Sequence, residues 1–214
     1  RPQRKFIFFN NSKLIDLTAA NFCVQPSSWD WTVLKYRINY AVKHTWTCTA
    51  NGFCVAVINP ISGDPVQSIL QNASPPGATL QDGQYGQYGN RHCAASALNS
   101  FDFHTNEASY WRPALKKFID TIPDGHYVLA YCQCNNNIQM DTTLYEAFEK
   151  IGSGQIRSLQ NNFPYFIWGK KGAAIGTATE KIGDSTKAVI SFSDTFSTKW
   201  KEGFITSEII GPAL

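Results

Sequence analysis

Apolar and polar residues alternate strictly along residues 34–42, LKYRINYAV. One face of this segment carries Leu34, Tyr36, Ile38, Tyr40 and Val42. The opposite face carries Lys35, Arg37 and Asn39. A repeat of two residues is typical of a strand with one buried face, so the pattern predicts a half-buried strand across the segment.

Uninterrupted apolar runs predict buried strands elsewhere in the chain. They lie at residues 53–59, 127–133 and 165–168, and further strands are expected near 187–193 and 204–210. Residues 71–95 show neither this pattern nor alternation, because Pro, Gly, Gln and Tyr dominate them. We expect a long irregular insert there, and long loops in compact domains are often functional.

Two segments repeat apolar residues at helical spacing. The first contains Leu115, Phe118, Ile119 and Ile122, and the second contains Leu144, Tyr145, Phe148 and Ile151. Asp141 is placed to cap the second helix at its start, and Gly152 to end it in a left-handed conformation.

Strands outnumber helices in this pattern. The fold class that it predicts is α+β: a sheet-dominated, mainly antiparallel and sandwich-like domain with two or three short flanking helices.

Composition narrows the function classes. The net charge of +3, from 19 basic and 16 acidic residues, is too small for a dedicated nucleic-acid-binding protein. No apolar run approaches the roughly 18 residues of a membrane span, so direct membrane insertion is not expected. A surface rich in uncharged polar residues favours an extracellular or cell-surface location. Because the chain begins at Arg1 without Met, we expect a processed product or a piece of a longer protein.

Six cysteines in a loop-rich chain predict disulfide bonds and an oxidising compartment. They are Cys23, Cys48, Cys54, Cys93, Cys132 and Cys134, and the sequence does not decide how they pair. Cys93 is a poor nucleophile candidate, since the adjacent His92 would point away from it on an extended segment. The Cys-x-Cys spacing of Cys132 and Cys134 does not fit zinc motifs. No catalytic residue, metal or cofactor is predicted.

The segment Gly169-Lys170-Lys171-Gly172 follows an apolar strand directly. A phosphate-binding loop needs a different glycine spacing, a following helix and a hydroxyl for magnesium. The segment therefore predicts a tight turn with positive φ at both glycines and two solvated lysines. Aromatic residues in loops are better candidates for a contact surface, and Tyr85, Tyr88 and Trp111 are the ones we expect to meet a partner.

Several segments, in this order and at these spacings, resemble the interleukin-like EMT inducer domain, also called the PANDER-like or GG domain. They are GFCVAVINPISGDPV (52–66), FDFHT (101–105), LKKFIDTIPDGHYVLAY (115–131), LYEAFEKIGSGQI (144–156), YFIWGKKG (165–172) and GTATE (176–180). The resemblance covers roughly residues 50–185 and implies that they form one domain, with the long insert at 71–95. Residues 1–49 would then be N-terminal strands that pack on or adjoin the core, and residues 186–214 would be C-terminal strands that complete the sheet. The resemblance also implies a compact sheet structure with short flanking helices, secreted or lumenal, without known catalytic residues.

A narrower resemblance involves YGQYG (85–89), GTATE and GFITSEIIGPA (203–213). These segments are similar to the form of the domain found in large Bacteroidota surface proteins that resemble the gingipain-type sortase of the type IX secretion system. A peptidase-like region would then lie outside this chain. One branch of the family recognises glycans, but this chain differs from the animal members at Cys134–Asn135 and Asn162–Phe163, so no glycan-binding residue is carried over.

Together these observations predict a non-catalytic extracellular recognition or scaffold module. The expected partner is another surface or secretion-apparatus protein. A glycan partner, which would make the chain a carbohydrate-binding module, and a free-standing cytokine-like protein are the alternatives.

Overall fold

The computed structural model of the protein describes most of the chain in separate ranges. These are residues 11–20, 35–45, 52–66, 69–70, 79–82, 86–90, 99–104, 108–132, 140–161, 163–184, 186 and 189–198. The strands in these ranges are β1 (Asn11–Ala20), β2 (Lys35–Ile38), β3 (Ala41–Thr45), β4 (Gly52–Ile58), β5 (Ile69–Leu70), β6 (Thr79–Asp82), β7 (Gly86–Asn90), β8 (Phe101–His104), β9 (Tyr127–Cys132), β10 (Tyr165–Lys170), β11 (Thr179–Ile182) and β12 (Val189–Thr198). The helices are α1 (Ala108–Thr121), α2 (Thr142–Glu149) and the short 3-10 helix η4 (Ile156–Ser158).

The central sheet has five antiparallel strands in the order β11-β10-β9-β4-β8. Its inner strands β4, β9 and β10 are the apolar runs that the sequence predicts as buried strands. Val55 in β4 is opposite Ala130 in β9, which in turn is opposite Ile167 in β10. These strands are apolar along their length because both faces of the sheet are covered.

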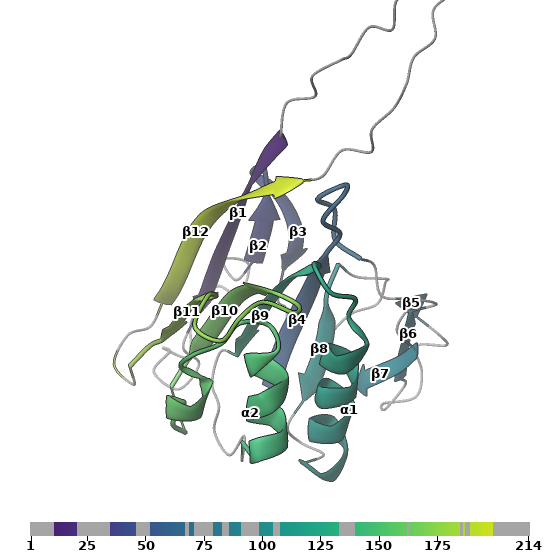
Figure 1. Ribbon diagram of the computed structural model, residues 1–214, viewed down its shortest axis with the longest axis vertical. Helices are drawn as coiled ribbons and strands as arrows, with labels where there is room; N and C mark the ends of the chain where they lie inside the picture. Colours follow the sequence, from purple (N-terminus) through teal and green to yellow (C-terminus); the bar gives the residue numbers. More distant parts are fainter. Residues whose placement is uncertain are drawn as a thin grey trace, which may run out of the picture.

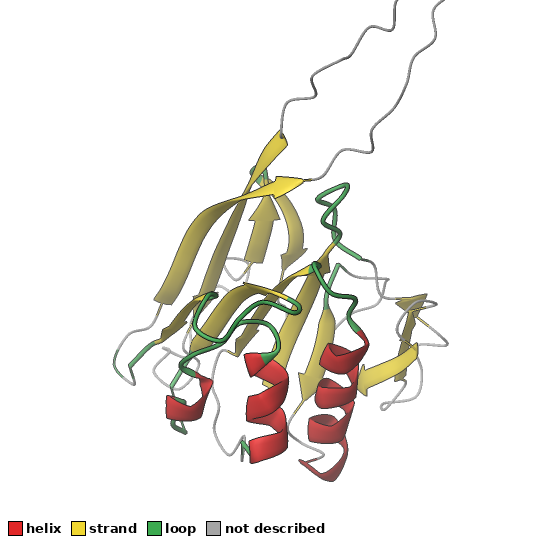
Figure 2. Ribbon diagram, in the orientation of Figure 1, coloured by secondary structure: helices red, strands yellow, loops and turns green. Residues whose placement is uncertain are grey.

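Helices α1 and α2 lie side by side over one face of the central sheet (Figures 1 and 2). Their apolar stripes pack on that face in one buried cluster, which includes Phe53, Val55, Leu115, Phe118, Leu144 and Phe148. Asp141 caps α2 as predicted, since its Oδ1 accepts a hydrogen bond from the N–H of Leu144 at 2.8 Å. Gly152 also takes the predicted left-handed conformation, with φ +93°.

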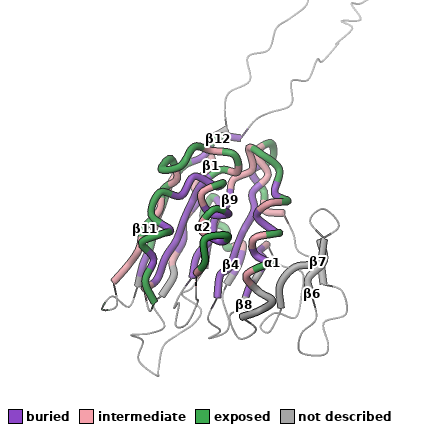
Figure 3. The backbone as a smooth tube through the Cα atoms, turned by 60° about the horizontal axis from the view of Figure 1, so that its bottom comes forward, coloured by how far each residue is buried: buried purple, intermediate pink, exposed green. Residues whose placement is uncertain are grey.

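A second sheet, in the order β12-β1-β2-β3, packs against the other face of the central sheet. The cluster between the sheets includes Ile15, Tyr36, Ile190, Phe196, Leu129 and Trp168. Buried residues run along the strands of both sheets, and exposed residues lie mainly on α2 and the loops (Figure 3). The sheet-dominated α+β class is thereby confirmed, and its sandwich-like arrangement stays a prediction.

Strands far apart in the sequence form the second sheet. β1 pairs with β12 over ten residues, from Asn11 opposite Thr198 to Ala20 opposite Val189 (Figure 1). The predicted domain boundaries at 49/50 and 185/186 stay predictions. The strand expected near 204–210 lies outside the described residues.

The prediction of one strand at residues 34–42 is wrong. The chain turns back at Asn39 and Tyr40, both with positive φ, and Ile38 at the end of β2 is opposite Ala41 at the start of β3. A two-residue turn shifts the phase of the alternation, so that Tyr40 is 79% exposed and Val42 is 51% exposed. Sequence alternation continues unbroken through the turn, which is why the pattern concealed it.

The insert at 71–95 is less irregular than predicted. It contains β6 and β7, which pair with each other, and β5 joins them in a small three-stranded sheet. β7 lies beside β8 and α1. Glycine and glutamine have low strand propensity, so the hairpin pairing here comes from context that the composition does not reveal.

The turn predicted at Gly169–Gly172 is present, with two differences. Gly172 has φ +80° as expected, whereas Gly169 lies within β10 and is not among the glycines of positive φ. A Cβ at Gly169 would lie 1.9 Å from the carbonyl oxygen of Ile151, so close approach explains this glycine. Lys171 is not solvated: its side chain is only 10% exposed, and its Nζ lies 3.8 Å from Asp124 Oδ1.

Candidate functional site

Three aromatic side chains meet where β12 crosses the central sheet. The rings of Tyr127 in β9 and Trp168 in β10 stack with centroids 5.2 Å apart and planes 9° apart. Phe196 in β12 contacts both rings, with centroid distances of 5.1 and 5.4 Å. The Tyr127 hydroxyl donates to the carbonyl oxygen of Ser197 at 3.1 Å. The cluster therefore joins the two sheets at this point.

A groove of about 310 Å³ opens over this cluster. It is formed by the start of β9, the end of β10, the loop after β10, the first residue of β11 and residues 194–197 of β12. The residues that line it are Tyr127, Trp168, Gly169, Lys170, Ala173, Thr177, Thr179, Asp194, Thr195, Phe196 and Ser197. Its volume is at the lower end of the range for small-molecule sites.

The groove carries one cation and one carboxylate. Lys170 Nζ lies 4.6 Å from the centre of the Tyr127 ring, a cation–π contact. The Asp194 carboxylate accepts a hydrogen bond from the N–H of Thr195 at 2.7 Å through Oδ1. Among the described residues, neither side chain makes an ion pair. Within the part of the chain that the structure describes, no opposite charge keeps either group from a ligand.

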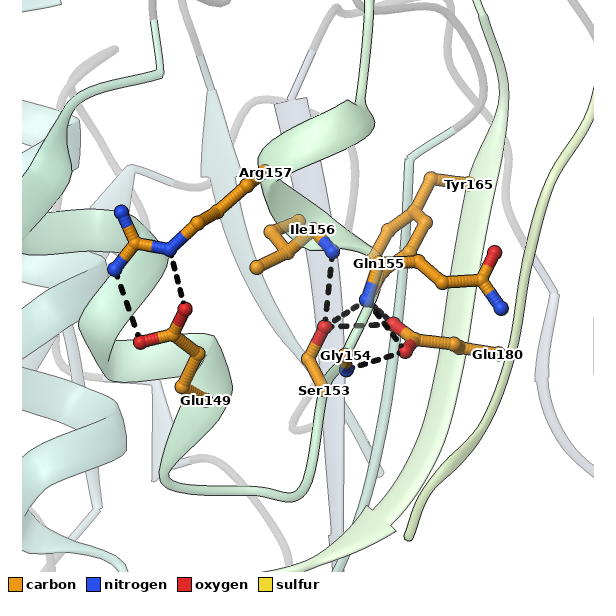
Figure 4. A network of polar contacts seen from close by, with 8 residues as sticks. All are labelled: Glu149, Ser153, Gly154, Gln155, Ile156, Arg157, Tyr165 and Glu180. Atoms are coloured by element: carbon orange, nitrogen blue, oxygen red, sulfur yellow. Dashed lines mark hydrogen bonds and ion pairs between the residues drawn. The ribbon is translucent and has the colours of Figure 1, made fainter. Parts of the chain in front are cut away.

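Glu180 of β11 directly follows the groove residue Thr179 and accepts hydrogen bonds from the loop after α2 and from β10 (Figure 4). Glu180 Oε1 accepts hydrogen bonds from the N–H groups of Gly154 and Gln155 at 2.6 and 2.8 Å. Its Oε2 accepts from the Ser153 and Tyr165 hydroxyls at 2.6 and 2.7 Å. Burial, and next the charge of Glu180, raise the pKa of Tyr165 well above its usual value, so this hydroxyl keeps its proton and donates.

Backbone hydrogen bonds extend this attachment to the loop that carries Thr177. The N–H groups of Gly176 and Ala178 both donate to the carbonyl oxygen of Gly152, at 2.9 and 3.1 Å. The N–H of Gly172 donates to the carbonyl oxygen of Lys150 at 2.8 Å. The loop after α2 therefore holds residues 172–180 in place, and with them the threonine side of the groove.

The cysteines do not form a reactive centre among the described residues. Cys54 and Cys132 lie on adjacent strands but belong to opposite faces of the central sheet, because Cys132 is opposite Phe53 rather than Cys54. Cys132 is a free, fully buried thiol, and burial raises its pKa to about 12. A thiol with such a pKa is protonated at neutral pH and is a poor nucleophile. Cys23, Cys48, Cys93 and Cys134 lie outside the described residues.

The predicted contact residues are not part of this groove. Tyr85 lies outside the described residues, whereas Tyr88 is placed in β7 and Trp111 in α1. Their role as a contact surface stays a prediction. Within the described ranges, no three His, Cys, Asp or Glu residues are grouped so that they could hold a metal ion. No helix in those ranges is both long and apolar enough to cross a membrane.

Comparison with known families finds a match for the central part of the chain. Residues 51–173, more than half of the 214, match the family model of the interleukin-like EMT inducer. The chain belongs to the interleukin-like EMT inducer family. This confirms the broader of the two resemblances, whereas the one to large Bacteroidota surface proteins stays a prediction. The family is cytokine-like, secreted and non-enzymatic. The comparison with curated proteins finds no match.

The interleukin-like EMT inducer match divides the groove into two parts. Tyr127, Trp168 and Lys170 lie within the matched residues, whereas Thr179 and the β12 wall lie beyond them. The groove is therefore built jointly by the family domain and by a strand that the family model does not include.

Sequence reasoning missed the groove, although one feature pointed to it. In β12, VISFSDTFST, apolar residues recur at Ile190, Phe192 and Phe196, and Asp194 occupies the remaining position of that series. A carboxylate on the apolar side of a strand needs a partner or a functional reason. The sequence prediction ended this strand near Ser193. Asp194 was therefore not recognised as part of the apolar series.

Proposed function

We propose that the chain is a non-catalytic recognition module of a secreted or cell-surface protein, and that its groove binds a carbohydrate. The single observation that carries the proposal is the Asp194 carboxylate, which has no ion pair within the described residues and lines the groove together with hydroxyl groups and with the ring pair of Tyr127 and Trp168. A carboxylate accepts hydrogen bonds from sugar hydroxyls. The Thr179 hydroxyl can donate and accept, whereas the Thr177 hydroxyl donates to the carbonyl oxygen of Ala174 at 2.6 Å and can accept from a ligand. The ring pair forms the floor of the groove and offers no free face for stacking, because Trp168 is buried and Lys170 lies over the Tyr127 ring, so polar groups carry the recognition.

A glycan array probed with the 214-residue chain, followed by calorimetric titration of a binding glycan, tests this proposal. Asp194→Asn is expected to weaken binding at least about tenfold, because a charge-assisted hydrogen bond contributes roughly 1.5–3 kcal/mol. The matched control is Ser191→Asn, on the same strand but on the exposed outer face. An array without binding at high protein concentration, or equal affinity for both variants, would contradict the proposal.

A protein partner is a second candidate function, favoured by the tip of the β2–β3 hairpin. Tyr40 is a bulky residue with φ +66°, a conformation that glycine or asparagine adopts more easily. Its ring is 79% exposed, and the neighbouring Val42 is half-exposed on the outer face of the sheet. An exposed aromatic residue kept in an unfavourable conformation suggests selection for contact rather than for stability.

Tyr40→Gly separates the two roles of this residue. The variant is expected to raise the free energy of unfolding by about 1 kcal/mol, because the left-handed conformation no longer strains a side chain. At the same time it should lose a partner recovered by the wild-type chain from surface extracts. Urea denaturation measures the first effect and pull-down the second. Asn39→Gly is the control for the pull-down, since it keeps the ring while it removes the Oδ1 that accepts from the N–H of Leu14 at 2.9 Å. Unchanged recovery by Tyr40→Gly would exclude the hairpin as the contact.

For the parent protein we propose a large Bacteroidota surface protein related to type IX secretion. Similarity of residues 85–89, 176–180 and 203–213 to that group supports this context. A free-standing cytokine-like protein is the alternative. The sequence of the full gene product distinguishes them, since a gingipain-like region in the same polypeptide is expected only for the first.

A further inference from the structure

Two opposite charges line the groove without meeting each other. Lys170 is the last residue of β10 and Asp194 lies in β12, and both belong to the lining of the same groove of about 310 Å³. Their side chains do not form an ion pair with each other. The groove therefore presents a cation and a carboxylate at two separate points.

A local contact orients each of these charges. Lys170 is opposite Tyr127 in the pairing of β10 with β9, and its Nζ lies over that ring at 4.6 Å from the centroid. Oδ1 of Asp194 accepts from the N–H of Thr195, and no donor to Oδ2 is present among the described residues. The ammonium group keeps its three protons and the carboxylate one oxygen for a ligand.

Aromatic rings give the two charges different surroundings. Phe192 and Phe196 flank Asp194 on the inner face of β12. Both rings contact Trp168, with centroid distances of 6.4 and 5.4 Å. The carboxylate is therefore on the Trp168 side of the stacked ring pair, whereas the ammonium group is over Tyr127.

Only a ligand with two charges satisfies both groups. A neutral sugar would displace water from the carboxylate and from the ammonium group and would return hydrogen bonds without charge. A ligand with a single charge would leave the other protein charge partly desolvated and without a partner, which costs free energy. A ligand with an ammonium group and a carboxylate would form a charge-assisted hydrogen bond at each point.

We propose that the groove selects a short zwitterionic saccharide, with an ammonium group bound to Asp194 and a carboxylate bound to Lys170. This inference rests on the proposed carbohydrate function and names the class of sugar. The Thr179 hydroxyl, which makes no side-chain hydrogen bond within the described residues, is available to the neutral part of such a ligand. The small volume of the groove suits one or two sugar rings.

One disaccharide in four charge states tests the proposal. The probe is the methyl glycoside of glucuronic acid linked to glucosamine, with the amine free or N-acetylated and the carboxylate free or methyl-esterified. The 214-residue chain is titrated calorimetrically at a pH at which the free amine is protonated. The zwitterionic form should bind at least about tenfold more tightly than either singly charged form, because each of those lacks one charge-assisted hydrogen bond.

Two groove variants assign each ligand charge to its partner. Asp194→Asn should abolish the gain in affinity from the free amine and retain the gain from the free carboxylate, and Lys170→Gln should do the reverse. The matched controls are Glu146→Gln on α2 and Lys181→Gln in β11. They remove the same charges from exposed positions outside the groove and should keep both gains.

The results separate this inference from the proposed function on which it rests. Equal affinity for all four forms overturns the inference but leaves carbohydrate binding standing. Tightest binding of a singly charged form also overturns it, and so does a preference for the zwitterion that both groove variants keep. If none of the four forms binds, the inference is wrong, whereas the neutral sugars of the glycan array decide the proposed function separately.

Discussion

Glu180→Gln should lower the free energy of unfolding by about 3 kcal/mol, because it removes a charged acceptor from four donors, two of which are hydroxyls of the buried residues Ser153 and Tyr165. In the native chain both carboxylate oxygens accept two hydrogen bonds each. The amide keeps only one acceptor oxygen, and its NH₂ group would face donors. Either the N–H groups of Gly154 and Gln155 or the hydroxyls of Ser153 and Tyr165 would lose their partner.

Urea denaturation measures this change, and Glu146→Gln is the matched control. Glu146 is exposed on α2, and no hydrogen bond of its side chain is present within the described residues. The same substitution there is expected to change stability by less than about 0.5 kcal/mol. Equal stabilities of the two variants would mean that the Glu180 contacts contribute nothing net. Weaker glycan binding by Glu180→Gln is also expected, since Thr179 directly precedes Glu180 in the groove wall.

The parts of the fold that the sequence predicted are those in which local pattern and burial agree. β4, β9 and β10 are covered on both faces, so their apolar runs identify them without knowledge of their neighbours. The cap at Asp141 and the left-handed Gly152 depend on a few adjacent residues and were likewise predictable. Local chemistry determines these features almost alone.

Features that depend on distant partners were not predictable in this way. The β2–β3 turn was missed because alternation continues through Tyr40, and only the pairing of Ile38 with Ala41 reveals the change of phase. The groove requires β12 to meet β9, as in the contact of Tyr127 with Phe196. A single sequence contains no information on which distant strands become neighbours, so no local pattern could bring these residues together.

The reason for a glycine can also depend on a distant residue. Gly169 looked like a turn residue because it precedes two lysines. It is a residue of β10 that passes close to the carbonyl oxygen of Ile151, just after α2. Its neighbours Trp168 and Lys170 both line the groove. The close approach therefore positions the strand that carries the aromatic and cationic parts of the candidate site.

Gly169→Ala is expected to lower the free energy of unfolding by about 3 kcal/mol, at the upper end of the usual cost of overpacking. The new methyl group would lie 1.9 Å from the carbonyl oxygen of Ile151 and 3.1 Å from Ala178 Cβ. The first neighbour is backbone and cannot rotate away, so β10 and the segment after α2 must separate. Separation would also weaken the Gly172 and Gly176 hydrogen bonds that hold the adjacent loop.

Gly176→Ala provides the comparison that isolates this steric effect. Gly176 has φ +82°, but a Cβ there would meet no atom within 4 Å. Its substitution should therefore cost only the conformational strain of a left-handed residue, about 1 kcal/mol. Denaturant unfolding of both variants should rank Gly169→Ala as clearly the less stable. The reverse order would mean that backbone conformation, rather than contact with Ile151, determines where this domain requires glycine.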